Sequence, residues 1–339
     1  MNTETFFTLP DGRNAELIKL RLADGFGVDL TTFGGCLTAL YAPDANGRLP
    51  DVLLGWKNPA DYLTNPGYLG ALVGRIPNRI SGGRFTLDGK VYQMCLNDNN
   101  VCTLHGGFGF SHRLWDLESV SDTEAVLSLF SCHGDGGFPG DLKVKVSYRI
   151  LANHTLEIEY YAESDRLTVA DFTNHAYFNL DGENSASTAE HSIIIHADRV
   201  TETDKFLQPT GRILPVDGSR FDLRQAKKFR EILAEYSNGF DDNFILSDGE
   251  TACREVATVN AGSSGIKLTV STTRPGIQFY MGGFLNDEGK SFYPRHSGFC
   301  LETQSWPDSV NHSHFPDVTI APGKPHRSLT CYTFGTYNA

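Results

Sequence analysis

The chain has 339 residues, of which 40% are hydrophobic and 21% charged, a composition typical of a folded globular protein and not of a disordered one. Its 29 Lys+Arg against 41 Asp+Glu give a formal net charge of −12, and without a basic cluster it is not expected to bind nucleic acid or anionic membrane. The N-terminal stretch has neither a basic start nor an apolar core, and no apolar run is long enough to span a bilayer, so we expect a cytoplasmic protein.

Strand-like alternation dominates the chain. It appears in residues 28–43 and 125–132, and again in 191–200 and 266–282. In residues 142–150 apolar and polar side chains alternate strictly, a break follows, and the alternation resumes at 156–160. This pattern predicts an antiparallel hairpin.

Residues 222–237 are the one convincing helical segment, with Phe229, Ile232, Leu233 and Tyr236 near one face. One helix cannot cover the two faces of a large parallel sheet, so the pattern favours an all-β, mainly antiparallel sandwich. No repeat, linker or shift in composition marks a boundary, and we expect a single domain over residues 1–339.

The seven cysteines are scattered, odd in number and without CxxC spacing. We expect most of them to be small buried residues in a reducing compartment. His312 and His314 form an HxH pair with no third ligand nearby, so we interpret them as loop histidines and expect no metal. Nucleotide-binding and nucleophile motifs are missing from the sequence, and we expect no cofactor.

Two candidate acid–base groups stand in unusual surroundings. Glu302 ends an apolar run, where an ionised carboxylate is costly to desolvate unless it serves a purpose. His175 shares one side of its segment with Thr173, Tyr177 and Asn179. This favours a histidine that lines a polar cleft over one whose hydrogen bonds are simply satisfied on a sheet face.

Other polar groups stand in glycine-rich segments, and each also has an ordinary explanation. His105 precedes two glycines that allow close approach of a ligand, but it could be a turn histidine. Arg79, beside Asn78, has a donor fork suited to vicinal hydroxyls, but it could form a surface ion pair. Asp241 and its neighbour Asp242 are expected to point one inward and one outward, unless they cap a turn. Together these groups and the 11% aromatic residues fit a sugar site.

Motifs in the same order along nearly the whole chain resemble the aldose 1-epimerase, or galactose mutarotase, family, and especially its animal-type members. The segments that carry the resemblance are FGGCLTALYAPD, GRIPNRI, LHGG, FPGDLKV, NHAYFNLDG, GFDDNF, GIQFYMGGF, SGFCLETQSWPDSVNH and APGKP. The resemblance implies a β-supersandwich with an open sugar cleft. It also implies interconversion of the α and β anomers of galactose, and usually glucose, without metal or cofactor, in cytoplasmic galactose metabolism. We expect a monomer or weak homodimer.

Carried over by motif, the resemblance implies Glu302 as general base and His175 as general acid, with His105 helping to polarise the ring oxygen. Substrate-binding residues would be Asn78, Arg79, Asp241 and Gln278. The chain departs from the family at Asp242, where relatives commonly have histidine, and at Ala176, where they have serine. The first departure adds negative charge near the cleft and could alter sugar preference.

Ring opening removes the proton of the C1 hydroxyl and protonates the ring oxygen, so one base and one acid must act together. The reference pKa values of glutamate and histidine, about 4.3 and about 6.5, allow this, and we expect a neighbouring carboxylate to raise the pKa of His175. Alternatives are a glycoside hydrolase using Glu302 and Asp241, a hexose-6-phosphate 1-epimerase, and an inactive sugar-binding protein of the same fold.

Overall fold

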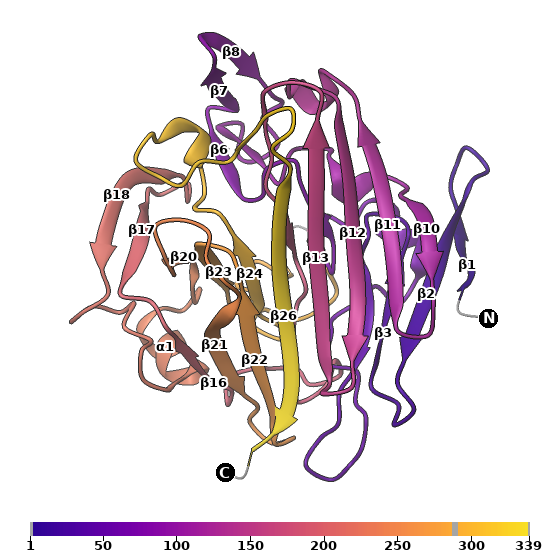
Figure 1. Ribbon diagram of the computed structural model, residues 1–339. Helices are drawn as coiled ribbons and strands as arrows, with labels where there is room; N and C mark the ends of the chain where they lie inside the picture. Colours follow the sequence, from indigo (N-terminus) through magenta and orange to yellow (C-terminus); the bar gives the residue numbers. More distant parts are fainter. Residues whose placement is uncertain (1–2, 287–290, 338–339) are drawn as a thin grey trace.

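The computed structural model describes residues 3–286 and 291–337, and every strand pair in these ranges that belongs to a sheet is antiparallel (Figure 1). The largest sheet has nine strands, in the spatial order β10 (Asp116–Val120), β11 (Glu124–Ser131), β12 (Leu142–Leu151), β13 (Thr155–Ser164), β26 (His326–Thr336), β22 (Ile266–Thr272), β21 (Arg254–Asn260), β16 (Ser192–Ile195) and β19 (Lys227–Lys228). The chain is therefore all-β and mainly antiparallel, as the sequence predicts.

A second sheet carries much of the site described below. Its five strands lie in the order β18 (Pro209–Pro215), β17 (Arg199–Thr203), β20 (Asp241–Ile245), β23 (Gly276–Tyr280) and β24 (Cys300–Gln304). An N-terminal sheet contains β1 (Thr3–Thr8), β2 (Asn14–Arg21), β3 (Gly27–Thr31) and β4 (Leu37–Tyr41). Its strands lie beside β10 and β11, on the opposite side of the molecule from β17 and β18 (Figure 1).

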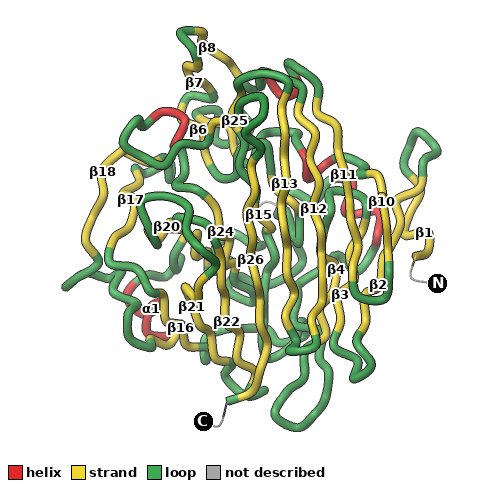
Figure 2. The backbone as a smooth tube through the Cα atoms, in the orientation of Figure 1, coloured by secondary structure: helices red, strands yellow, loops and turns green. Residues whose placement is uncertain are grey.

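Four short ladders complete the described strands. They pair β5 (Leu72–Val73) with β15 (Thr173–Asn174), β6 (Arg79–Ser81) with β9 (Cys102–Leu104), β7 (Arg84–Leu87) with β8 (Lys90–Gln93), and β14 (Thr168–Val169) with β25 (Thr319–Ile320). Short 3-10 turns span Pro59–Leu63, Phe110–His112, Asp135–Gly137 and Ser309–Asn311. Strands and loops make up nearly all of the backbone (Figure 2).

The predicted hairpin is confirmed. Strands β12 and β13 pair from Leu142 opposite Ser164 to Leu151 opposite Thr155. Along β12 the apolar side chains from Leu142 to Ile150 are buried and alternate with exposed or half-exposed polar ones. The buried face packs into one large hydrophobic core with Phe172, Phe178 and residues of β22 and β26. Alternation thus encodes the inner and outer faces of this sheet.

The helix is shorter than predicted. The sequence predicts a helix over 222–237, but α1 covers only Phe229–Glu235. Lys227 and Lys228 pair with Ile193 and Ser192 at the edge of the nine-stranded sheet, which removes the first helical turns. The face with Phe229 and Ile232 does pack into the core. Among the residues described, no helix has the length and apolar character needed to cross a membrane.

The expectation for the cysteines is wrong for most of them. Cys36, Cys102 and Cys300 are buried, whereas Cys95, Cys132 and Cys253 are exposed and Cys331 is half-buried. Thr330 and Tyr332 on either side of Cys331 are buried, so alternation turns the Cys331 side chain to the other face of the strand. A small apolar residue on a strand therefore does not by itself identify a core position.

Candidate active site

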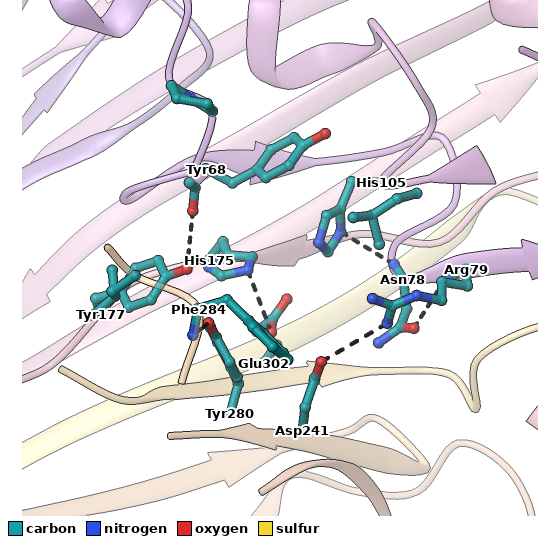
Figure 3. A pocket seen from close by; sticks show the side chains of 14 residues that line it. Tyr68, Asn78, Arg79, His105, His175, Tyr177, Asp241, Tyr280, Phe284 and Glu302 are labelled. Carbon is teal, nitrogen blue, oxygen red and sulfur yellow. Dashed lines mark hydrogen bonds and ion pairs between the residues drawn. The ribbon is translucent and has the colours of Figure 1, made fainter. Parts of the chain in front are cut away.

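A cleft opens where the five-stranded sheet meets the loops that follow β5, β9 and β15 (Figure 3). The residues that line it come from the whole length of the chain: Pro66, Gly67, Tyr68, Asn78, Arg79, Leu104, His105, His175, Tyr177, Asp241, Tyr280, Phe284, Leu285 and Glu302. Six of the seven predicted site residues are in this set. The seventh, Gln278, lies beside it, where its Nε2 donates to Asp241 Oδ1 at 2.7 Å.

Glu302 lies in the middle of β24, directly opposite Gln278 of β23. It is 2% exposed, and its Oε2 has no hydrogen-bond partner among the described residues. Burial, reinforced by Asp241, raises the pKa of this carboxyl well above its usual value, and Arg79 opposes that rise. An acceptor oxygen is thus held ready inside a poorly solvated cleft.

His175 follows β15, and its backbone N–H donates to Ala71 O at 2.8 Å. Its side chain lies between two groups of β24: Nε2 is 3.8 Å from Glu302 Oε1, and Nδ1 is 3.4 Å from Cys300 Sγ. The expectation of a raised pKa is wrong here, because burial lowers the pKa of His175 to about 4. Desolvation of the imidazolium is the largest cause of this shift.

The buried histidine and glutamate form a candidate acid–base pair. Burial raises the pKa of Glu302 and lowers that of His175, so it favours the neutral form of both groups. Transfer of a proton across the 3.8 Å gap to His175 would give a carboxylate and an imidazolium without any proton entering from water. The pair contains one acid and one base in either arrangement.

Asn78 and His105 form a two-way clasp at the end of the β6–β9 ladder. The backbone N–H of His105 donates to Asn78 O at 3.0 Å, and the backbone N–H of Asn78 donates to His105 Nδ1 at 3.2 Å. A backbone N–H can only donate, so Nδ1 is the acceptor and the proton of the neutral ring is on Nε2. Burial, with His175 and Arg79 nearby, keeps the pKa of His105 well below its usual value. His105 is thus a neutral hydrogen-bond donor.

Glycine is required immediately after His105. A Cβ on Gly106 would lie 2.4 Å from Gly74 O, and the φ of this residue is +71°. Any other residue would push the histidine out of the cleft. The glycines of the LHGG segment therefore set the position of the imidazole.

Arg79 is 9% exposed, so it is not the surface ion pair that the sequence left open. Its Nε donates to Asp98 Oδ2 at 2.8 Å, and its Nη1 is 3.9 Å from Asp241 Oδ2 (Figure 3). The guanidinium and Asp241 face the same space from opposite walls. Together they present donors and acceptors suited to neighbouring hydroxyls.

The family model for aldose 1-epimerases matches residues 16–333 of the chain. The chain belongs to the aldose 1-epimerase family. Galactose mutarotase of Rattus norvegicus is 42% identical over 340 residues, and that of Sus scrofa is 43% identical over 336 residues, covering 98% and 97% of both chains, respectively. The crystal structure of an aldose epimerase homologue from C. elegans superimposes with a TM-score of 0.89 at 30% identity, covering 96% of this chain and 100% of the other.

Family membership confirms two expectations from the sequence. The fold is that of the galactose mutarotase-like proteins, since the galactose 1-epimerase of Lactobacillus acidophilus also superimposes with a TM-score of 0.85 over 99% of both chains at 25% identity. The chain is also an enzyme of the isomerase class.

The departure from the family at Asp242 lies on the other side of β20 from Asp241. The expectation that one of the two aspartates points outward is wrong, because Asp241 lines the cleft and Asp242 is only 5% exposed and lies 3.7 Å from Arg220. Burial raises the pKa of Asp242 to about 6, although Arg220 opposes the rise. Both residues line a neighbouring groove that meets the sugar cleft at Asp241. The other departure, Ala176, is buried in the core.

His105, His175 and Glu302 also resemble a set of metal ligands, with one potential ligand atom from each all within 4.8 Å. The clasp with Asn78 argues against that use, because it leaves the proton of neutral His105 on Nε2 and no free lone pair on the ring. His312 lies 3.5 Å from Asp308, and His314 Nε2 lies 2.8 Å from Gly211 O, so neither histidine lines the cleft.

Sequence reasoning missed the aromatic walls and Asp98. Tyr68 and Tyr177 pack against the His175 ring, with centroids 6.1 and 4.8 Å away, and Tyr280 lies at 6.3 Å. Tyr177 was expected on the same side as His175, but no role was assigned to it. In sequence these residues are indistinguishable from core aromatics, and Asp98 from an ordinary turn aspartate.

Proposed function

We propose that this enzyme interconverts the α and β anomers of D-galactose, and also of D-glucose, by acid–base-catalysed opening of the pyranose ring. The proposal is supported most by the buried Glu302 carboxyl, with one oxygen beside His175 and the other without a partner among the described residues. Relatives over 40% identical across nearly the full length are galactose mutarotases.

In the proposed reaction Glu302 and His175 move two protons in opposite directions. The C1 hydroxyl gives its proton to Glu302, the bond between C1 and the ring oxygen breaks, and the ring oxygen takes a proton from His175. The open aldehyde then turns about the bond between C1 and C2. Return of both protons closes the ring on the other face of the carbonyl and restores the enzyme.

Burial favours the neutral forms of Glu302 and His175, so the scheme requires the bound sugar to favour their charged forms. A hydroxyl that donates to Glu302 Oε2 would favour the carboxylate, and the released proton has His175 as its nearest acceptor at 3.8 Å. Burial makes the carboxylate a stronger base than a solvated one and the imidazolium a stronger acid.

The other predicted residues hold the sugar in this scheme. His105 donates from Nε2 toward the ring oxygen, where a neutral donor stabilises developing charge without competing as an acid. Asn78, Arg79 and Asp241 bind hydroxyls, and Gln278 acts on the sugar through its hydrogen bond to Asp241. The tyrosines offer apolar surface to the C–H faces of the ring.

A hexose 6-phosphate fits the cleft less well. Arg79 is the only Lys or Arg among the fourteen lining residues shown, and it already faces the carboxylates of Asp98 and Asp241. In the adjoining groove Arg220 and Lys205 are outnumbered by Asp204, Asp241 and Asp242. A dianionic phosphate would meet net negative charge on both sides.

The test is polarimetry on freshly dissolved α-D-galactose and α-D-glucose with wild type, Glu302→Gln and buffer alone. Acceleration by wild type that the variant loses supports the proposal. A protein that binds galactose in calorimetry without accelerating either exchange would be an inactive sugar-binding protein. Release of reducing sugar from an aryl glycoside would instead indicate a hydrolase.

A further inference from the structure

The orientation of Arg79 depends on a residue outside the cleft. The described residues give its guanidinium one hydrogen bond, from Nε to Asp98 Oδ2 at 2.8 Å. The approach of Nη1 to Asp241 Oδ2, at 3.9 Å, is too long to be a second one. Asp98 therefore holds the inner edge of the fork, and the two Nη groups are left to face the cleft.

Asp98 is itself fixed by a tight turn. Its backbone exchanges two hydrogen bonds with Cys102, both 3.3 Å long, and its carbonyl accepts from Val101 at 3.0 Å. Its second carboxylate oxygen accepts from Asn99 Nδ2 at 2.9 Å. Asp98 does not line the cleft, and among the described residues its hydrogen bond to Arg79 is the one that links its carboxylate to a lining side chain.

We propose that Asp98 is a positioning residue for the sugar, which aims the Arg79 fork at substrate hydroxyls and offsets the positive charge of Arg79 beside the acid–base pair. This inference rests on the proposed function, because it requires Arg79 to bind the sugar. Fixing one edge of a planar fork removes most of the rotamer freedom that binding would otherwise have to restrict.

The second part of the proposal concerns the charges around Glu302. The groups that face it come from several elements: Arg79 (β6), His105 (after β9), His175 and Tyr177 (after β15), Asp241 (β20), Cys300 (its own strand) and Tyr332 (β26). Among these Arg79 lowers the pKa of Glu302 and Asp241 raises it. Removing the charge of Asp98 leaves Arg79 less compensated, so the pKa of Glu302 falls.

Two substitutions separate position from charge. Asp98→Ala removes the acceptor and the charge, whereas Asp98→Asn retains an acceptor oxygen and removes only the charge. The control is Asp29→Asn, which neutralises another aspartate paired with an arginine, Arg21 at 2.5 Å, on strands that do not line the cleft. For each variant we would measure KM and kcat by polarimetry, galactose Kd by calorimetry, the pH dependence of kcat/KM and thermal unfolding.

For Asp98→Ala we expect KM and Kd to rise roughly tenfold, the loss of one charged hydrogen bond, with kcat within about threefold of wild type. Asp98→Asn should recover most of the affinity, while the alkaline limb of its kcat/KM profile moves to lower pH. Asp29→Asn should change none of these quantities. In an Arg79→Ala background, Asp98→Ala should raise Kd no further.

The inference is overturned if folded Asp98→Ala binds galactose like wild type, or if its effect persists without Arg79. An Asp98→Ala protein that melts earlier but retains wild-type KM would show a purely structural role. Failure of the proposed function is a separate result, since wild type itself would then not accelerate anomer exchange. The calorimetric Kd values would still test Asp98 in that case.

Discussion

Arg79 in the cleft and Arg149 on the nine-stranded sheet both face carboxylates from other segments of the chain, yet their surroundings differ. Arg149 contacts Glu124, Glu157 and Glu159, is about one-third exposed, and sits on the outer face of β12. Arg79 is almost fully buried and faces Asp98 and Asp241. Antiparallel strands thus carry solvent-screened ion pairs around Arg149 and desolvated ion pairs around Arg79. The difference in burial separates the two cases.

The two sheets differ in how many of their faces are exposed to solvent. On β12 buried and exposed positions alternate, so charges have one side on which to lie in water. On β23 and β24 all ten residues are buried, and Gln278 and Glu302 remain inside because loops cover them. Buried polar groups on strands of this kind carry an energetic cost, and the proposed function would account for their presence.

The largest expected difference between the two sheets comes from neutralising one glutamate on each and comparing the effect on kcat. Glu302→Gln should lower kcat by roughly 10² to 10⁴, or about 3 to 5 kcal/mol of barrier, because it removes the base and retains the shape. Glu157→Gln on β13 should leave kcat unchanged. Polarimetry on α-D-galactose measures both, and near-wild-type turnover by Glu302→Gln would remove it from the base role.

A second test follows from the buried acid–base pair, whose active form holds one proton. His175 has a pKa near 4, so a second proton binds only below that pH, and kcat/KM should fall about tenfold per pH unit there. Above the raised pKa of Glu302 the pair has lost its proton, and kcat/KM should fall again. A decline centred instead near pH 6.5 would show that His175 titrates as a solvated histidine does.

Arginine chemistry gives the next contrast. Arg79→Lys replaces a held fork with a single ammonium and should raise the KM for galactose roughly tenfold, the value of about one charged hydrogen bond. Arg149→Lys should leave KM unchanged and alter the free energy of unfolding by less than about 1 kcal/mol. Steady-state kinetics and urea unfolding measure the two effects, and equal effects on KM would undo the distinction.

The smallest expected effect belongs to the residue that departs from the family. Asp242 lies across β20 from the cleft and beside Arg220, so Asp242→Asn should change kcat and KM by less than about threefold. Galactose and glucose should be affected alike when their exchange rates are compared. A change of tenfold or more in the ratio between the two sugars would make Asp242 a specificity determinant.

Sequence patterns predicted the parts of the fold in which one face meets water. The alternation of residues 142–150 gave β12 directly, and the shared polar side of His175 and Tyr177 placed both in the cleft. Of the seven site residues expected from the resemblance to the family, six line the cleft.

The rest depended on contacts that no local pattern records. Lys227 and Lys228 directly precede a helix in the sequence, but they form a short strand because they pair with Ile193 and Ser192. The low pKa of His175 results from burial, to which segments distant in sequence contribute, such as the strand that carries Cys300. The proposed role of Asp98 depends on its hydrogen bond to Arg79, which is 19 positions away in the sequence.

The cleft also has a consequence for how the protein acquires activity as it folds. Cys300 and His175, whose side chains touch, are 125 residues apart in the chain, and the cleft also needs the ladder of β6 and β9. Such long-range pairings form late and slowly in β proteins. Regain of activity after dilution from denaturant therefore times the completion of the whole sandwich, whereas spectroscopic signals from single sheets can recover earlier.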